Sequence, residues 1–188
     1  MLLSILIPTL EKRNDKFMAL YINFCRQVVN LKLDNDIEIL YHQNNGEVNI
    51  GNIRNMLIAR SKAKYIVFFD DDDTPHKKYI ETLTTALKGG PDVVSFDGEV
   101  NFNGQGKRDM IFRLRYKSFS GADNTFTRPP THLCPMKRSL VKNFLFNDDV
   151  KGSDVKWAMA ISDAGVLKKE FVIEEKLYFY NYDSTKDK

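Results

Sequence analysis

The sequence predicts an α/β fold with a doubly wound, mainly parallel sheet and a small antiparallel excursion in its second half. In residues 1–97, short apolar runs alternate with segments of helical periodicity. These runs are nearly continuous, as in strands that helices cover on both faces. After residue 97, extended segments follow one another with turn signals between them. With 188 residues and a 43% hydrophobic content, the chain is expected to form one domain with its own core.

The first half is expected to contain four strands and three helices. The first strand ends at Pro8, and Asp15 caps the helix that follows. Thr74 is expected to cap the third helix, with Pro75 as its first residue. In chain order, the expected strands and helices cover residues 2–7, 15–31, 37–41, 51–63, 65–69, 75–87 and 92–96.

The second half has a different pattern. Residues 99–102 and 110–116 read as antiparallel strands joined by an Asn103-Gly104 turn. An irregular loop begins at residue 128, and a helix over residues 154–164 ends at Gly165. Residues 170–180 are expected to be extended, and residues 183–188 form a polar tail.

Four consecutive carboxylates, Asp70 to Asp73, follow the apolar run that forms the third strand. Adjacent negative charges repel one another most strongly where water is partly excluded, so a fold tolerates them when a cation relieves the repulsion. Ligands of open α/β sheets bind beyond the carboxyl ends of the strands, where this run lies. The run therefore predicts a metal or phosphate site, in preference to acidic decoration of the helix expected from Pro75.

Composition excludes several classes of protein. No run of about twenty apolar residues is present to span a membrane, and the first residues read as a strand rather than a signal peptide. The net charge of +3 comes without a basic stripe interleaved with aromatic residues, which argues against nucleic-acid binding. Cys25 and Cys134 form no disulfide framework. A cytoplasmic protein is expected, and peripheral contact with a membrane surface stays open.

Four segments in this order resemble the family-2 glycosyltransferases of the GT-A fold. The Gly-x-x-Arg-Asn segment is moderately specific, the strand ending in Pro-Thr is weak alone, and the ordered set is the strong signal. The segments are Ser4-Ile5-Leu6-Ile7-Pro8-Thr9-Leu10, Ile50-Gly51-Asn52-Ile53-Arg54-Asn55, Tyr65-Ile66-Val67-Phe68-Phe69-Asp70-Asp71-Asp72-Asp73, and His132-Leu133-Cys134-Pro135-Met136-Lys137-Arg138 followed by Gly152-Ser153-Asp154.

The resemblance implies a metal-dependent site for a nucleotide-sugar donor. The family's Asp-x-Asp motif maps onto Asp70 and Asp72, which would hold Mn²⁺ or Mg²⁺ against the diphosphate. Asp72 would be the direct ligand, and Asp70 would face the ribose or the water shell of the metal. His132 is a further candidate metal ligand, although a lone histidine is more often structural.

The resemblance also places residues around the donor nucleotide. The helix N-terminus near Gly51 offers free N–H groups, and Arg54 could pair either with phosphate or with the acidic run itself. Many family members read the base with an aspartate after the second strand, where this chain has His42-Gln43-Asn44-Asn45, so the base stays undetermined. The residues expected to line the donor site are Pro8, Thr9, Glu11, Arg13, Gln43, Gly51, Arg54, Asp70 and Asp71.

The general base implied by the resemblance is Asp154. Inverting members carry a Glu-Asp pair at the start of a late helix, and this chain has Ser153-Asp154 there. One carboxylate beside the acceptor hydroxyl is sufficient for the chemistry, although acids are also common in a first helical turn. Ser153 and Trp157 are candidate acceptor contacts, and Trp157 could equally belong to the core.

The resemblance therefore implies an inverting hexosyltransferase of polysaccharide or glycan biosynthesis. Residues 1–97 would bind the nucleotide sugar, with a UDP-sugar favoured, and residues 98–182 would carry the base and hold a glycan, lipid-linked or other hydroxyl acceptor. Two alternatives remain. The Asp70-x-Asp72-x-Thr74 pattern also fits a haloacid-dehalogenase-like phosphatase, and Ser153 in place of glutamate allows a catalytically weak nucleotide-sugar binding protein.

Overall fold

The computed structural model describes residues 1–102, 106–122, 124–149 and 152–182. One mixed sheet contains the ten strands found in these ranges, in the order β2-β1-β3-β9-β5-β6-β8-β7, with β10 beside β5 and β4 beside β10. The strands are β1 (Leu3–Leu10), β2 (Ile37–Asn44), β3 (Tyr65–Phe68), β4 (Thr74–Pro75), β5 (Val93–Phe102), β6 (Lys107–Phe112), β7 (Ser120–Ala122), β8 (Thr125–Arg128), β9 (Met136–Lys137) and β10 (Glu170–Tyr182).

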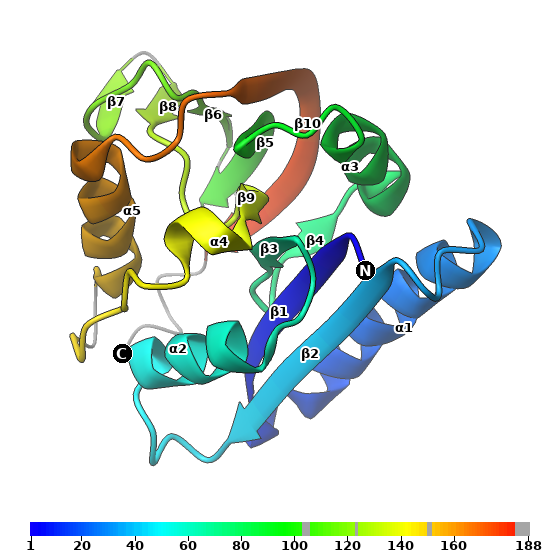
Figure 1. The fold of residues 1–188 in the computed structure, drawn as a ribbon. Coiled ribbons are helices and arrows are strands. Elements are labelled where there is room, and N and C mark those ends of the chain that lie inside the picture. Colours follow the sequence, from blue (N-terminus) through cyan, green and yellow to red (C-terminus); the bar gives the residue numbers. More distant parts are fainter. Residues whose placement is uncertain (103–105, 123, 150–151, 183–188) are drawn as a thin grey trace.

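Helices connect and cover these strands (Figure 1). The α-helices are α1 (Asn14–Asn30), α2 (Ile50–Arg60), α3 (Tyr79–Leu87), α4 (Arg138–Val141) and α5 (Ser153–Ala164), and a short 3-10 helix, η1, covers Glu11–Arg13. Gly165 follows α5 in a left-handed conformation (φ 57°), which confirms the expected end of that helix.

The centre of the sheet is parallel, as the sequence predicts. Strand β1 pairs in parallel with β2 and with β3. Strand β9 is antiparallel to both β3 and β5, so β3 and β5 run in the same direction. Strand β10 also runs parallel to β5. The carboxyl ends of the central strands therefore meet at one edge.

Two adjacent phenylalanines at the end of β3 show how the two faces of the sheet are buried. Phe68 points to one face and lies 5.6 Å from the ring of Phe146. Phe69 points to the other face, where its ring lies 5.1 Å from Phe24 of α1 and 5.4 Å from Tyr79 of α3. Helices α1 and α2 accordingly cover opposite faces of β1 (Figure 1). The core thus has two layers, one on each side of the sheet.

The first strand is longer than expected, because Pro8 does not end it. β1 continues through Pro8 to Leu10 while pairing with β2. Its pairing with β3 stops at Leu6. Beyond Leu6, β1 is therefore an edge strand on that side, where a residue without an N–H is tolerated.

The expected helix start at Thr74 is wrong. Thr74 and Pro75 form β4, which pairs in antiparallel fashion with Tyr178 and Phe179 of β10, and α3 begins only at Tyr79. Tertiary pairing overrides the local N-cap signal. The acidic run therefore does not decorate a helix N-terminus. Asp15 likewise lies in the first turn of α1 rather than at its cap.

The antiparallel excursion is confirmed, since β5 pairs with β6 from Asp97 to Asn101. The expected Asn103-Gly104 turn lies outside the described residues.

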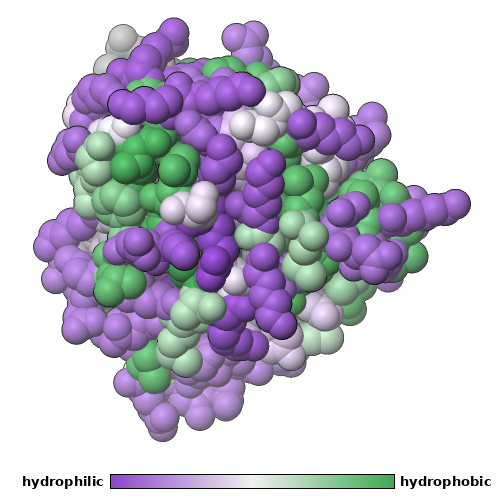
Figure 2. Space-filling model, viewed as in Figure 1, coloured by the Kyte–Doolittle hydropathy of each residue, from purple (hydrophilic) through white to green (hydrophobic). Residues whose placement is uncertain are grey.

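Hydrophilic residues cover most of the face shown in Figure 2, with apolar residues in separate patches. None of the helices in the described part of the chain is long and apolar enough to cross a bilayer.

Candidate functional site

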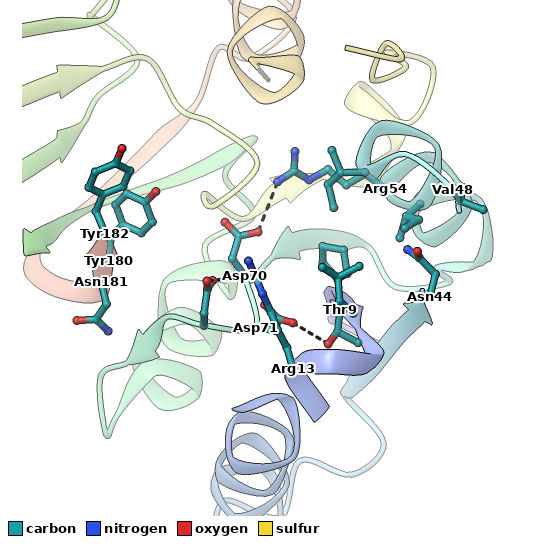
Figure 3. A pocket seen from close by; sticks show the side chains of 15 residues that line it. Thr9, Arg13, Asn44, Val48, Arg54, Asp70, Asp71, Tyr180, Asn181 and Tyr182 are labelled. Carbon is teal, nitrogen blue, oxygen red and sulfur yellow. Dashed lines mark hydrogen bonds and ion pairs between the residues drawn. The ribbon is translucent and has the colours of Figure 1, made fainter. Parts of the chain in front are cut away.

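A cavity of about 330 Å³ lies at the carboxyl ends of β1 and β3, where the acidic run begins (Figure 3). The N-terminal half of α2 forms a second wall, and the end of β10 forms a third. Its lining residues are Pro8, Thr9, Leu10, Arg13, Asn44, Val48, Ile50, Ile53, Arg54, Asp70, Asp71, Asp72, Tyr180, Asn181 and Tyr182.

Asp70 faces two basic side chains. Its carboxylate lies 3.4 Å from Nη2 of Arg54 and 3.8 Å from Nε2 of His132. Burial raises the pKa of Asp70, but the nearby His132 and the charge of Arg54 more than offset this and hold the pKa below its ordinary value. Asp70 is therefore an anion at neutral pH, and its side chain keeps 30% exposure.

Asp71 has a structural environment. Its side chain is 3% exposed, Thr9 donates a hydrogen bond to it at 2.7 Å, and Nη1 of Arg13 donates another at 2.9 Å. Both partners come from the end of β1 and from η1. Asp71 therefore ties the first strand to the acidic run, which places Thr9 and Arg13 at the cavity as predicted.

Asp72 shares Arg13 with Asp71, at 3.1 Å, and is 24% exposed. Burial raises the pKa of Asp72, and the charges of Asp71 and Asp70 add to the rise, although Arg13 opposes it. The repulsion expected within the run is therefore present at this carboxylate.

Asp73 is buried and turns away from the cavity toward β10. The Tyr178 hydroxyl donates to its carboxylate, and the Asn181 backbone N–H donates at 3.0 Å. Burial and the charge of Asp70 raise the pKa of Asp73 to about 8. These bonds fix the end of β10 beside the acidic run, which is how Tyr180 and Tyr182 reach the cavity.

The predicted nucleotide residues are only partly brought together. Glu11 is exposed and lies outside the cavity wall, and Gln43 donates instead to Asn14 at 3.3 Å. Asn44, the next residue, lines the cavity. Its Oδ1 accepts from the Gly46 N–H, and its buried Nδ2 has no partner among the described residues. Of the two adjacent candidates for contact with the base, Asn44 is therefore the one that reaches the cavity.

Gly51 has a packing role in place of the predicted cavity contact. A Cβ at this position would lie 2.0 Å from the backbone oxygen of Asn147. Asn49 caps α2 by accepting from the Asn52 N–H at 2.8 Å. The close approach lets α2 pack against the segment around Asn147 and directs Arg54 into the cavity (Figure 3).

Arg54 and His132 form a buried pair beside Asp70. Nη2 of Arg54 lies 3.2 Å from Nε2 of His132. The Arg54 guanidinium also lies 5.3 Å from the Phe146 ring, and its Nε has no partner among the described residues. His132 lies next to Asp70 but does not line the cavity, which agrees with a structural role for this residue.

The late helix carries the predicted base. Asp154 is in the first turn of α5, is half-buried and lies outside the cavity lining. Ser153 is buried. Trp157 is 3% exposed, stacks on Phe146 at 4.7 Å and donates to the Phe144 carbonyl at 2.9 Å. Its ring faces are covered, so the acceptor-stacking alternative for Trp157 is wrong and the core alternative is correct.

Comparisons with known proteins bear on this site. The sequence profile described as Glycosyl transferase family 2 matches residues 23–148. The chain belongs to this family. Its matched region contains the Gly-x-x-Arg-Asn segment, the acidic run and His132. No curated protein matches the sequence.

Solved structures share the fold of this family-2 chain. S. aureus TarS 1-349 is 15% identical with a TM-score of 0.68, and the alignment covers 96% of this chain and 60% of that one. The complex of TarS 1-349 with UDP-GlcNAc is 14% identical, with a TM-score of 0.64 and coverage of 98% and 59%. The family-2 chain therefore spans about 60% of the length of these structures.

A third solved structure is glucosyl-3-phosphoglycerate synthase from Mycobacterium tuberculosis, in complex with Mn²⁺, UDP and glucosyl-3-phosphoglycerate. It is 13% identical with a TM-score of 0.59, and the alignment covers 99% of this chain and 74% of that one. The three likenesses confirm the predicted α/β fold of the GT-A type.

The carboxylates of this family-2 chain fit a divalent cation. Within the described ranges, no three His, Cys, Asp or Glu side chains form a metal-binding cluster by themselves. Asp70 and Asp72, however, both open onto the cavity. A cation between them would relieve the repulsion that raises the pKa of Asp72. Mg²⁺ sites commonly combine one or two carboxylates with phosphate oxygens and water, so a diphosphate would complete the set.

The sequence did not predict the wall that the end of β10 adds to the cavity of this family-2 chain, namely Tyr180, Asn181 and Tyr182. They end a strand whose sequence carries no motif, 107 or more positions after the acidic run. The sequence did contain one signal for this wall. The fourth carboxylate of the run, Asp73, needed hydrogen-bond partners from another part of the chain. Asn44 was considered together with Gln43, and only the structure distinguishes them.

Proposed function

We propose that this family-2 chain is a metal-dependent glycosyltransferase that transfers a sugar from a nucleotide diphosphate sugar, with a UDP-sugar favoured, to an acceptor hydroxyl. One observation carries the proposal. Asp70 and Asp72 open together onto a cavity at the strand ends, and Arg13 and Arg54 flank them there. The family match favours this reading over the phosphatase alternative.

The donor would occupy the side of the cavity formed by β1, β2 and α2. Asp70 and Asp72 would hold Mn²⁺ or Mg²⁺, and the bound metal would neutralise charge on the leaving diphosphate. Arg54 directs a partly unpartnered guanidinium to the same place and would bind phosphate oxygen. Asn44 lines this side of the cavity, and its side-chain amide would hydrogen-bond the base.

The transfer would be a single displacement with inversion, with Asp154 as the general base. Asp154 would accept the proton of the acceptor hydroxyl as its oxygen attacks the anomeric carbon. The bond from that carbon to the diphosphate breaks on the opposite face, and the nucleotide diphosphate leaves. Figure 1 shows the N-terminal end of α5, which carries Asp154, on the same side of the sheet as α2. A glycan, lipid-linked or other hydroxyl acceptor and a cytoplasmic location remain part of this proposal.

Calorimetric titration tests the donor site. UDP and GDP are titrated with and without Mn²⁺ into the wild-type protein, into Asp72→Asn and into Asp163→Asn, whose exposed carboxylate lies on α5. We expect Mn²⁺-dependent binding of UDP that Asp72→Asn weakens by about tenfold or more, the scale of a lost metal-site group. Asp163→Asn should bind as the wild type does.

Two results would contradict the proposal. Equal affinity with and without Mn²⁺ would remove the metal from the donor site. No binding of either nucleotide would return the phosphatase alternative, which a screen of phosphate esters then tests.

A further inference from the structure

Arg128, the last residue of β8, lies beside both the predicted base and the cavity. Its guanidinium carbon is 5.4 Å from the centre of the Phe119 ring and 5.7 Å from that of Phe126. The side chain interacts electrostatically with Asp154 and with Tyr180, which lines the cavity. The electrostatic field of Arg128 therefore reaches both the N-terminal turn of α5 and the β10 wall.

Arg128 differs from the other arginines of the site in having no carboxylate partner. Arg13 pairs with Asp71 and Asp72, and Arg54 pairs with Asp70. Arg113, at the end of the neighbouring strand β6, pairs with Asp97 at 2.8 Å. Among the described residues, no carboxylate forms an ion pair with Arg128.

The charge of Arg128 is only partly compensated. Burial lowers the pKa of Arg128, and the more distant negative charge of Asp154 opposes that effect. Arg128 is half-buried. Contacts with ring faces return only about 0.5–2 kcal/mol, and a charge that is partly removed from water is costly without a hydrogen-bonded counter-ion. An anionic ligand would supply that counter-ion. The two aromatic rings hold the guanidinium plane, which favours two-point binding of a phosphate or carboxylate.

We propose that Arg128 binds an anionic group of the acceptor, a phosphate or a carboxylate, next to the hydroxyl from which Asp154 takes the proton. This inference rests on the proposed glycosyltransferase function and names the class of acceptor. The anion belongs to the acceptor because the donor diphosphate has its own cations in Arg13 and Arg54. Figure 3 shows Tyr180, with which Arg128 interacts electrostatically, across the cavity from Arg54.

Ligand-observed NMR tests this inference with three small probes. Glycerol 3-phosphate carries a phosphate, glycerate a carboxylate, and glycerol no charge. Each probe is titrated into the wild-type protein with and without saturating UDP and Mn²⁺, and into Arg128→Gln, Arg128→Lys and Arg108→Gln. Arg108 is the matched control, because its guanidinium also lies 5.7 Å from the Phe126 ring but is exposed on β6.

We expect at least one anionic probe to bind more tightly than glycerol, and the tighter of the two anions identifies the group. Arg128→Gln should weaken that binding by about tenfold to a hundredfold, the scale of a charged hydrogen bond. Arg128→Lys should give an intermediate loss, and Arg108→Gln should change nothing. UDP binding with Mn²⁺ should be unchanged in all three variants, which shows that they fold.

Any one of the following outcomes would overturn the inference. Glycerol could bind as well as the anions, anion binding could survive Arg128→Gln unchanged, or Arg108→Gln could weaken it equally. A protein that binds UDP but no anionic probe would also overturn the inference while leaving the proposed function standing. Failure to bind UDP, by contrast, contradicts the proposed function, and the titrations without nucleotide still decide the role of Arg128.

Discussion

The two sides of the cavity are built on different principles. On the donor side, the negative charges have partners within the protein, because Arg13 and Arg54 pair with Asp70, Asp71 and Asp72. On the opposite side, aromatic rings surround Arg128, which has no paired carboxylate among the described residues. Donor-side charges therefore stabilise the fold, in addition to the ligand binding proposed for them. Changes on the other side should affect transfer more than folding.

The largest expected effect comes from Asp154→Asn, on the acceptor side. The amide cannot take the hydroxyl proton, so the rate of sugar transfer should fall by about 10²- to 10⁴-fold. UDP affinity and the free energy of unfolding should stay at wild-type values. Assays of transfer and of UDP binding on the same preparation check this. Transfer at the wild-type rate would remove the base assignment and with it the functional division between the two sides.

Trp157→Ala sharpens the comparison by separating core from acceptor site. Removing the buried indole should lower the free energy of unfolding by about 3–5 kcal/mol in urea denaturation. Trp157→Phe keeps an aromatic ring on Phe146 and loses the bond to the Phe144 carbonyl, at a cost of about 1 kcal/mol. The KM for the acceptor should not change in Trp157→Phe. A raised KM at normal stability would restore the sugar-stacking role.

Arg13→Gln tests whether donor-side charges support the fold. It leaves the buried Asp71 with Thr9 as its remaining side-chain partner, so the free energy of unfolding should fall by about 1–3 kcal/mol. Lys12→Gln, which changes an exposed charge in the same 3-10 helix, is the control. Its free energy of unfolding should fall by less than about 0.5 kcal/mol. Equal stability of the two variants would mean that the donor side is no more structural than its surroundings.

The smallest effect is expected at Asp92, a carboxylate that belongs to neither side of the cavity. Burial raises the pKa of Asp92, but hydrogen bonds from Lys137 and from the N–H groups of Lys168 and Lys169 lower it to about 2. Because the folded pKa is depressed, Asp92 stabilises the fold above its unfolded pKa of about 3.9, and this is lost as pH falls toward 2. Between pH 4 and pH 2, the melting temperature of Asp92→Asn should therefore fall less steeply than that of the wild type. An unchanged acid slope would contradict the assignment.

The sequence predicts the first half of the fold well, because its apolar runs are long and its helices are periodic. The acidic run was found because four adjacent carboxylates are hard to explain without a site. The helix start at Thr74 was mispredicted because a two-strand pairing with β10 competes with a local cap, and local sequence does not show that partner. Tyr180 and Tyr182 were missed for the same reason, since only tertiary pairing brings their strand to the cavity.

The Asp73 contact with β10 also has a consequence for protein synthesis. The Asn181 N–H reaches a carboxylate 108 positions earlier in the chain. Translation proceeds at about 5–20 residues per second, so about 5–20 seconds separate the synthesis of these two residues. During that interval the acidic run has emerged while one wall of the cavity is still missing. We therefore expect the chain to acquire its complete cavity only after residue 182 has left the exit tunnel.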